Sequence, residues 1–166
     1  MYEMLHEPEA RSAATHDLEA LYREAAPALW RSLYGFTGGR RQLAEDALAE
    51  AFARALEHAE RIRAPLPWIY RTAFRLATRE LRAERREPVR PPDPVPGLDP
   101  GEVHDIVVAL AALPERQRAS VILHDQEGFT APEVGRMLGI AAPTVRVHLF
   151  RGRARLRDLL NEEDER

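Results

Sequence analysis

Cysteine and lysine are both missing from this sequence of 166 residues, in which all 24 Lys or Arg positions are Arg. Without cysteine there can be no disulfide framework, no thiolate zinc site and no cysteine nucleophile, which excludes several classes of enzyme and secreted domain. The preference for Arg over Lys is typical of a GC-rich genome. The absence of thiols also fits a reducing compartment.

Long apolar runs are missing as well. No stretch approaches the roughly 18 apolar residues that a membrane span needs, and the first ten residues carry three glutamates instead of the apolar core of a secretory signal. We therefore expect a cytoplasmic protein.

Signatures of catalysis are also absent from the sequence. The six His residues are scattered without metal-binding spacing, and neither a phosphate-binding glycine loop nor a Gly-x-Ser-x-Gly motif occurs. We expect no enzymatic activity, no metal site and no cofactor.

Charge is strongly segregated along the chain. Residues 61–90 contain nine Arg against three acids, and residues 136–157 contain six Arg and no acid, whereas residues 91–135 are strongly acidic. Two cationic stretches in an otherwise acidic protein favour a polyanion contacted at two places. The alternative is that both stretches are solvated helix faces.

Proline divides the chain, because six prolines lie between positions 88 and 100 and no helix or strand continues through such a segment. On both sides the apolar spacing is helical, and no alternating strand pattern occurs. We predict an all-α protein of two small helical domains joined by a Pro-rich linker. The expected parts are an acidic extension (1–14), a first domain (15–87), the linker (88–101), a second domain (102–160) and an acidic tail (161–166).

Two helices are expected first in the chain, with Pro27 either opening a further helix or kinking the first. Their apolar stripes contain Leu18, Leu21, Tyr22, Ala25, Leu29 and Leu33, then Leu43, Ala47, Leu48, Ala51, Phe52, Ala55 and Leu56. Opposite the second stripe lie Glu45, Asp46 and Glu50. Three acids on one outer face suit a basic protein partner better than a metal ion.

A third helix should begin near Trp68. Its arginines recur every three or four residues and so form one stripe, consisting of Arg71, Arg75, Arg79, Arg82 and Arg86. Trp68, Tyr70 and Phe74 are interleaved with them. A cationic groove with aromatic platforms is typical of proteins that hold unpaired nucleic-acid strands. The alternative is that Trp68 and Phe74 are core residues.

Residues 130–157 have the layout of a helix-turn-helix. Thr130 and Glu133 are spaced as a capping box, Gly139 with Ile140 forms the turn, and Pro143 suits the first turn of the last helix. That helix should bury Val145, Leu149, Gly152 and Leu156. Its other faces carry Thr144, Arg146, Val147, His148, Phe150, Arg151, Arg153, Ala154, Arg155 and Arg157, and no acid from 143 to 157, which favours the major groove of DNA over a plain helical hairpin.

In order and type these motifs resemble the extracytoplasmic-function sigma factors of bacterial RNA polymerase, from about Leu18 to Leu160. The similar positions are residues 43–52, Trp68 to Arg71, residues 109–118, and Gly139, Ile140, Thr144, Val145, Leu149, Arg151, Arg153 and Leu156. The resemblance implies a subunit without catalytic activity that binds core RNA polymerase, recognises promoter DNA and initiates transcription of a specific regulon. An anti-sigma factor is a candidate further partner.

The resemblance also implies roles for individual residues. Glu45, Asp46 and Glu50 lie in the segment that binds core polymerase. The implied -10 contacts are Trp68, Tyr70, Arg71, Phe74, Arg75, Arg79 and Arg82, and the implied -35 contacts are Thr144, Arg146, Val147, His148, Arg151, Arg153 and Arg155.

Three groups of positions depart from the family pattern. Phe74 and Arg75 stand where the family usually has Arg-Asn, and Arg79 stands where an Asp usually follows four residues after that Asn. Ala49 replaces a common Gln. Val147 with His148 replaces a frequent Ser-Arg pair. We expect atypical promoter preferences. A stand-alone helix-turn-helix regulator is the alternative function, and a protein that only sequesters a partner is a third.

Overall fold

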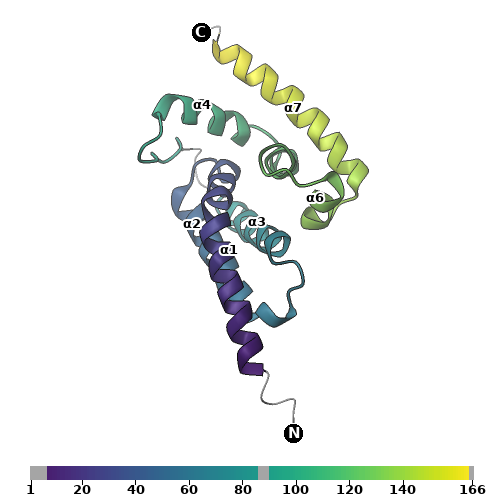
Figure 1. Ribbon diagram of the computed structural model, residues 1–166. Coiled ribbons are helices and arrows are strands. Elements are labelled where there is room, and N and C mark those ends of the chain that lie inside the picture. Colours follow the sequence, from purple (N-terminus) through teal and green to yellow (C-terminus); the bar gives the residue numbers. More distant parts are fainter. Residues whose placement is uncertain (1–6, 86–89, 165–166) are drawn as a thin grey trace.

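The computed structural model describes residues 7–85 and 90–164, and within these ranges it contains helices and connecting loops but no strand (Figure 1). The N-terminal half consists of α1 (Glu7–Phe36), α2 (Arg41–Glu57), the short 3-10 helix η2 (Ala59–Arg61) and α3 (Pro65–Ala83). The C-terminal half consists of α4 (Pro100–Ala111), α5 (Glu115–Val121), the π-helical turn η3 (Ile122–Gln126), α6 (Ala131–Leu138) and α7 (Ala142–Asp164). The all-α fold class with a C-terminal helix-turn-helix is confirmed. None of the described helices combines the length and apolar character that crossing a bilayer requires.

Several helices extend across the domain limits expected from the sequence. Helix α1 begins at Glu7 and α7 ends at Asp164, so regular helix continues through the limits placed at 14/15 and 160/161. Helix α4 begins at Pro100, inside the expected linker, because Asp99 caps it by accepting a hydrogen bond from the Gly101 amide at 2.8 Å. Pro27 lies inside α1, so it does not open a second helix. The domain limits themselves stay predictions.

Alanine brings the helices of the N-terminal half close together. The buried face of α2 includes Ala44, Ala51 and Ala55, and that of α3 includes Ala73 and Ala77, all with no exposed surface. Small side chains at these positions let the two helices approach closely. Larger residues fill the remaining space and form the core in which α1 lies against both helices.

The described part of the linker lies against the turn between α1 and α2. Asp93 accepts a hydrogen bond from the Arg41 amide at 2.9 Å and so supplies the N-terminal cap of α2 that Arg40 does not provide. The Asp93 amide donates to the Gly39 carbonyl at 2.9 Å. Gly39 has φ +79°, and a side chain there would collide with Pro92. The turn and the linker therefore fit each other closely.

The two halves pack on one another. A single hydrophobic cluster includes buried residues of both, and Figure 1 shows α4 crossing the C-terminal end of α1. Gly35 in α1 permits this crossing, because a Cβ at that position would lie 3.3 Å from Leu110 of α4. Arg118 of α5 reaches from the C-terminal half to the Phe36 carbonyl at 2.7 Å. The linker therefore joins two halves that share one core.

The helix-turn-helix forms as its sequence predicts. Thr130 Oγ1 accepts from the Glu133 amide at 3.3 Å, while the Glu133 carboxylate accepts from the Thr130 amide at 2.7 Å, which completes the capping box. Gly139 ends α6 with φ +69°. Pro143 lies in the first turn of α7.

Gly152 marks the closest approach of α7 to α5. A Cβ at position 152 would lie 2.9 Å from Cγ2 of Val121, a β-branched side chain that cannot rotate away freely. Gly152→Ala should therefore lower the free energy of unfolding by about 1 to 3 kcal/mol, although Ala is the better helix former. Urea unfolding followed by circular dichroism measures this change.

Val121→Ala provides the control for that prediction, because it removes the methyl group that an Ala at 152 would meet. The double variant should lose less stability than the sum of the two single losses. Strictly additive losses would contradict a contact between these two positions.

Candidate nucleic-acid interface

The exposed face of α7 carries the predicted DNA-reading set. Val145 and Leu149 are 0% and 4% exposed and fix the helix on the core. The other faces place in solvent the predicted residues Thr144, Arg146, Val147, Arg151, Arg153 and Arg155, while His148 is half-buried. In Figure 1, α7 is the outermost helix of the C-terminal half, which leaves this face open to a large ligand.

Phe150 is a residue of this face that sequence reasoning placed on its flank but did not select as a contact. Its side chain is 77% exposed, and Val147, one turn earlier, is 46% exposed. Exposed apolar groups on a helix that enters the major groove can contact thymine methyl groups. The sequence held a signal for this exposure, because Phe150 lies among arginines and outside the apolar stripe of its helix.

Arg153 is held by an ion pair within the C-terminal half. Its guanidinium contacts Asp125 through Nε at 2.8 Å and Nη2 at 2.5 Å, a two-bonded geometry that joins α7 to η3. The hydrogen bond from Arg153 lowers the pKa of the Asp125 carboxyl below its ordinary value. Arg153 thus helps to orient the recognition helix. If it also contacts DNA, as predicted, the same guanidinium must bond both DNA and Asp125.

His148 lies in surroundings that disfavour its charged form. Burial lowers the pKa of its imidazole, and the neighbouring charges of Arg116 and Arg151 lower it further. A neutral ring can donate or accept one hydrogen bond at a base edge but does not attract a phosphate as a cation would.

The predicted -10 face of α3 is only partly accessible. Arg71, Arg75 and Arg79 are exposed, Trp68 is half-buried, and Arg86 lies outside the described residues. Tyr70 and Phe74, however, are each only 2% exposed. The expectation that one of them presents an open stacking face is not met in this arrangement, because Phe36 of α1 packs against Phe74 while Glu127 and Phe129 of the C-terminal half contact Tyr70.

Residues of the C-terminal half make the contacts that cover this face. Tyr70 donates to Glu127 Oε2 at 2.5 Å and packs edge-on against Phe129, with ring centroids 5.0 Å apart. The other oxygen of Glu127 accepts from Ser32 of α1 at 2.5 Å. Arg82, another predicted strand contact, donates to Glu115 at 2.9 Å.

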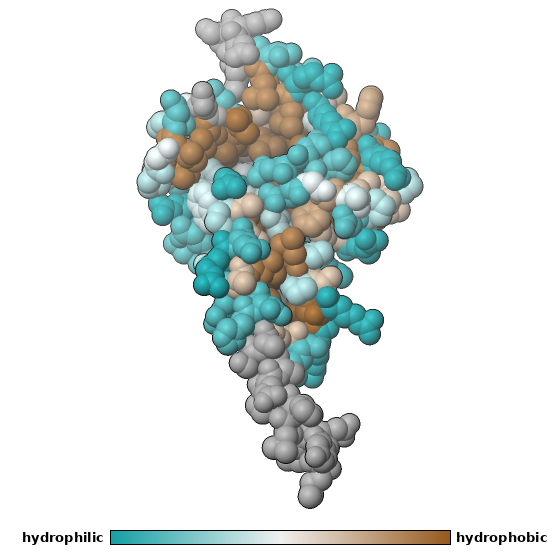
Figure 2. Space-filling view, in the orientation of Figure 1, coloured by the Kyte–Doolittle hydropathy of each residue, from teal (hydrophilic) through white to brown (hydrophobic). Residues whose placement is uncertain are grey.

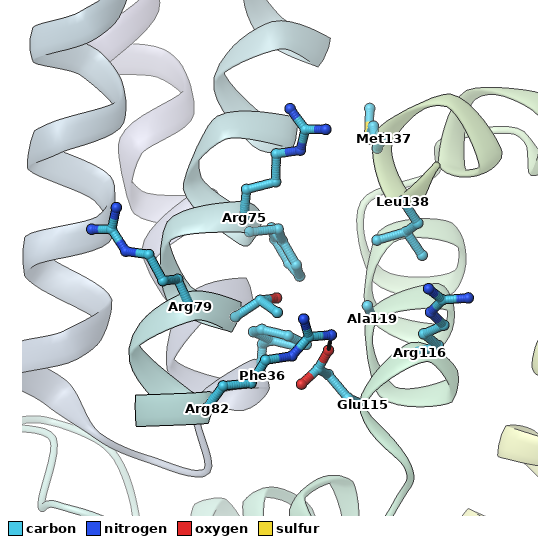
Figure 3. Close-up of a pocket in the computed structure, with 11 residues that line it drawn as sticks. Phe36, Arg75, Arg79, Arg82, Glu115, Arg116, Ala119, Met137 and Leu138 are labelled. Atoms are coloured by element: carbon cyan, nitrogen blue, oxygen red, sulfur yellow. Dashed lines mark hydrogen bonds and ion pairs between the residues drawn. The ribbon is translucent and has the colours of Figure 1, made fainter. Parts of the chain in front are cut away.

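A crevice of about 380 Å³ separates α3 from α5 and α6 beside these contacts. Figure 3 shows Arg75, Arg79 and Arg82 projecting from α3 on one side, and Glu115, Arg116 and Leu138 on the other. The dashed line in that view is the Arg82 to Glu115 ion pair. Phe36 and Phe74 also line the crevice, with ring centroids 4.9 Å apart.

The three acids of α2 lie on its outer face, as expected, and each has a partner within the helix. Arg41 bonds Glu45 at 2.8 Å, Gln42 bonds Asp46 at 2.8 Å and Arg54 bonds Glu50 at 2.7 Å. Glu45 borders a groove toward α1, while Asp46 and Glu50 border a groove toward α3. The acids therefore line both flanks of one exposed helix.

Two exposed apolar areas were not anticipated. Tyr22 and Leu56, which the sequence placed in buried stripes, are 46% and 48% exposed beside Phe52. On α4, Ile106 and Val108 are 53% and 39% exposed, and Figure 2 shows apolar residues gathered over this helix. Exposed apolar areas of this kind often mark contacts with other proteins.

The comparison with family models identifies both halves of the chain. The model for sigma-70 region 2 matches residues 21–87, and the model for sigma-70, region 4 matches residues 104–156. The first range contains α2 and α3, and the second contains the helix-turn-helix. The fold and the exposed α7 thus have the pattern of a sigma-70 protein.

Relatives with curated descriptions define the family more closely. The ECF RNA polymerase sigma factor SigL of Mycobacterium tuberculosis is 31% identical, over 92% of this chain and 94% of its own length. The ECF sigma factor SigE of Mycolicibacterium smegmatis is 32% identical over 89% of this chain. The chain spans 63% of the length of SigE and 64% of the length of the ECF sigma factor SigM of Mycobacterium tuberculosis. The chain belongs to the extracytoplasmic-function RNA polymerase sigma factors, a family of DNA-binding regulators and not of catalysts.

Solved structures agree with this fold. The sigma factor RpoE of Bartonella quintana, solved with the anti-sigma factor NepR, superposes with a TM-score of 0.77 at 20% identity, over 87% of this chain and 97% of that one. CnrH, solved with the cytosolic domain of CnrY, gives a TM-score of 0.72 at 20% identity, over 93% and 94%.

The ion pair between Asp125 and Arg153 should contribute stability that depends on pH. Because the folded carboxyl has a lowered pKa, its contribution is complete above the ordinary value near 4 and is lost as pH falls through the lower folded value. Asp125→Asn should lower the free energy of unfolding at pH 7 by about 0.5 to 1 kcal/mol, as for a partly exposed pair.

Urea unfolding of both proteins at pH 7 and near pH 3 measures this difference, which should shrink in acid. Asp105→Asn, at an exposed position of α4, is the control for loss of one carboxylate. A difference that stays constant down to pH 3 would contradict the assignment.

Proposed function

We propose that this protein is a promoter-specificity subunit that docks on core RNA polymerase, recognises the -10 and -35 elements of its promoters and initiates transcription of a specific regulon. It has no catalytic activity of its own, uses no cofactor and acts in the cytoplasm, where the polymerase works. The observation that carries the proposal is the presence, in one chain, of a region 2 match and a region 4 match with an open, acid-free face on α7.

Docking on the polymerase is assigned to the outer face of α2. Glu45, Asp46 and Glu50 present negative charge there, and the exposed apolar side chains of Tyr22 and Leu56 lie near the end of the same helix. Acids of this kind chiefly set the rate and specificity of association, while the apolar groups contribute buried area. The area over α4 is a candidate second protein contact.

Promoter reading is divided between two helices. Helix α7 lies in the major groove of the -35 element, with Arg146 at a base edge, Arg151 on a phosphate, and Val147 with Phe150 against thymine methyl groups. Helix α3 follows a strand of the -10 element with Arg71, Arg75 and Arg79. The proposed domains, 15–87 and 102–160, each carry one of these helices.

An anti-sigma factor is proposed as a further partner, on the ground that RpoE, which shares this fold, was solved in complex with the anti-sigma factor NepR. A stand-alone DNA-binding regulator is the alternative function. Transcription by reconstituted holoenzyme from a library of promoter fragments separates the two, because a regulator that does not dock on core polymerase would add no promoter-specific transcript.

Reversing charge on α2 should weaken docking on core polymerase. Asp46→Arg combined with Glu50→Arg replaces two exposed acids by cations at the proposed contact. This variant should compete at least tenfold less well against another sigma factor for core enzyme. A tenfold loss corresponds to about 1.4 kcal/mol of binding free energy, which we expect reversed interface charges to cost or exceed. Competition is measured by the yield of transcripts from each factor's promoter.

The matched control for this docking prediction is Asp158→Arg with Glu162→Arg, which makes the same charge change at exposed positions near the end of α7. Equal competition by the α2 variant and the unchanged protein would show that these acids do not dock.

Variants of α7 should separate base contacts from phosphate contacts. Arg151→Ala should weaken binding to all duplex sequences alike and reduce the slope of log K against log salt by about 1. Arg146→Ala should instead reduce discrimination at one base pair of the -35 element by about 1 to 3 kcal/mol. Fluorescence anisotropy with labelled duplexes over a range of salt concentrations measures both effects. Binding that does not change with salt would exclude duplex reading by α7.

A further inference from the structure

The crevice between α3, α5 and α6 combines a cationic wall and an apolar wall in one space (Figure 3). We propose that it binds a small ligand in which an aromatic ring is joined to two or more phosphate groups, as in a purine nucleoside diphosphate. Its volume of about 380 Å³ falls within the range of small-molecule sites. The site is additional to the proposed function and does not depend on it.

Guanidinium groups dominate the charge of this crevice. The described residues that line it include one acid, Glu115, and four arginines, which are Arg75, Arg79 and Arg82 of α3 and Arg116 of α5. Neither Arg75 nor Arg116 forms a hydrogen bond or an ion pair with any other described residue. A space with net positive charge and two uncommitted guanidinium groups favours an anionic ligand.

The ion pairs of Glu115 show how an anion is held at one end of the crevice. Its carboxylate accepts from Arg82 at 2.9 Å and from Arg85 at 3.2 Å, and its side chain is 19% exposed. A carboxylate or a phosphate between two guanidinium groups has this arrangement. Because a guanidinium has five N–H donors, Arg82 keeps donors for a second anion while Glu115 fixes its direction.

The other wall of the crevice is apolar. Met137 and Leu138 of α6 face Arg75 across the space in Figure 3, and the ring of Phe74 also lines it. Leu138 is half-buried, so part of its side chain is still in contact with water. A planar ring between these walls would cover Leu138 on one side and stack on the guanidinium of Arg75 on the other.

A ligand with both parts fits this combination better than either part alone. A single phosphate would meet exposed arginines, at which one ion pair contributes little. An uncharged ring would leave the guanidinium groups without a partner. Adjacent phosphates contact several arginines together while the ring occupies the apolar wall, so the second contact follows the first at a high effective concentration.

The test titrates the full chain with ADP that carries a methylanthraniloyl fluorophore, without polymerase or DNA. We expect saturable binding, and unlabelled ADP should displace the probe about tenfold better than adenosine or pyrophosphate, because each of these keeps only one part of the ligand. No saturable binding up to about 1 mM, or displacement by pyrophosphate as good as that by ADP, would reject the site.

Variants place the binding in the crevice. Arg75→Ala with Arg116→Ala should weaken ADP binding about tenfold or more, and both positions are exposed, so no core contact is lost. Arg71→Ala with Arg157→Ala is the matched control, because it removes the same charge at exposed positions of α3 and α7 outside the crevice. It should leave ADP binding unchanged. An equal loss in both pairs would show only a general attraction for anions and overturn the proposal.

Unfolding provides a second readout that does not use the fluorophore. A ligand that binds the folded chain alone stabilises it, so saturating ADP should raise the urea midpoint of the unchanged chain and of the control pair, but not that of the Arg75 and Arg116 variant. Equal shifts in all three proteins would place ADP elsewhere on the molecule.

Discussion

One half-buried arginine, Arg118, bonds to both halves of the molecule and ties them together. It donates to the Phe36 carbonyl at the end of α1 at 2.7 Å, and to the carbonyls of Ala111 and Leu113 after α4 at 3.0 Å each. The last carbonyls of a helix have no partner within the helix, so this side chain satisfies helix ends that the packing of the halves removes from water. Its charge also lies 5.7 Å from the centre of the Phe36 ring. Removing it would leave carbonyls unpaired in a closed interface, which costs more than the bonds themselves contribute.

A consequence of this joint is that the two helices proposed to read promoter DNA have different surroundings. Helix α7 is held by its own half, through Val145, Leu149 and the pair of Arg153 with Asp125, so its outer face is complete without the N-terminal half. Helix α3 lies at the joint, and its aromatic residues serve as core there. Burial of Tyr70 and Phe74 adds apolar contact to the shared core, so neither ring offers an open stacking face in this arrangement.

The sequence predicted the helices and most of their inward-facing residues, but not which surfaces of neighbouring helices cover them. Helical period, the capping box at Thr130 and Glu133, and the turn at Gly139 are local signals, and each formed as expected. The partners of Tyr70 and Arg82 lie 57 and 33 residues away in sequence, and no local pattern encodes such pairs. For the same reason Tyr22 and Leu56, which the sequence placed in apolar stripes, proved to be exposed. An apolar side chain indicates a surface that is more stable when it is covered. Packing between helices that are distant in the sequence determines whether it is covered.

Segregated charge has the same ambiguity. The basic stretch at residues 61–90 indicates a polyanion, and DNA is one candidate. The acidic stretch that follows it, residues 91–135, is another, since Glu115 and Glu127 both come from it and bond Arg82, Arg85 and Tyr70 of the basic stretch. An internal acid is present at a high effective concentration because it is tethered to the same chain. Segregated charge in a sequence therefore does not by itself distinguish an external polyanion from an acidic segment of the same chain.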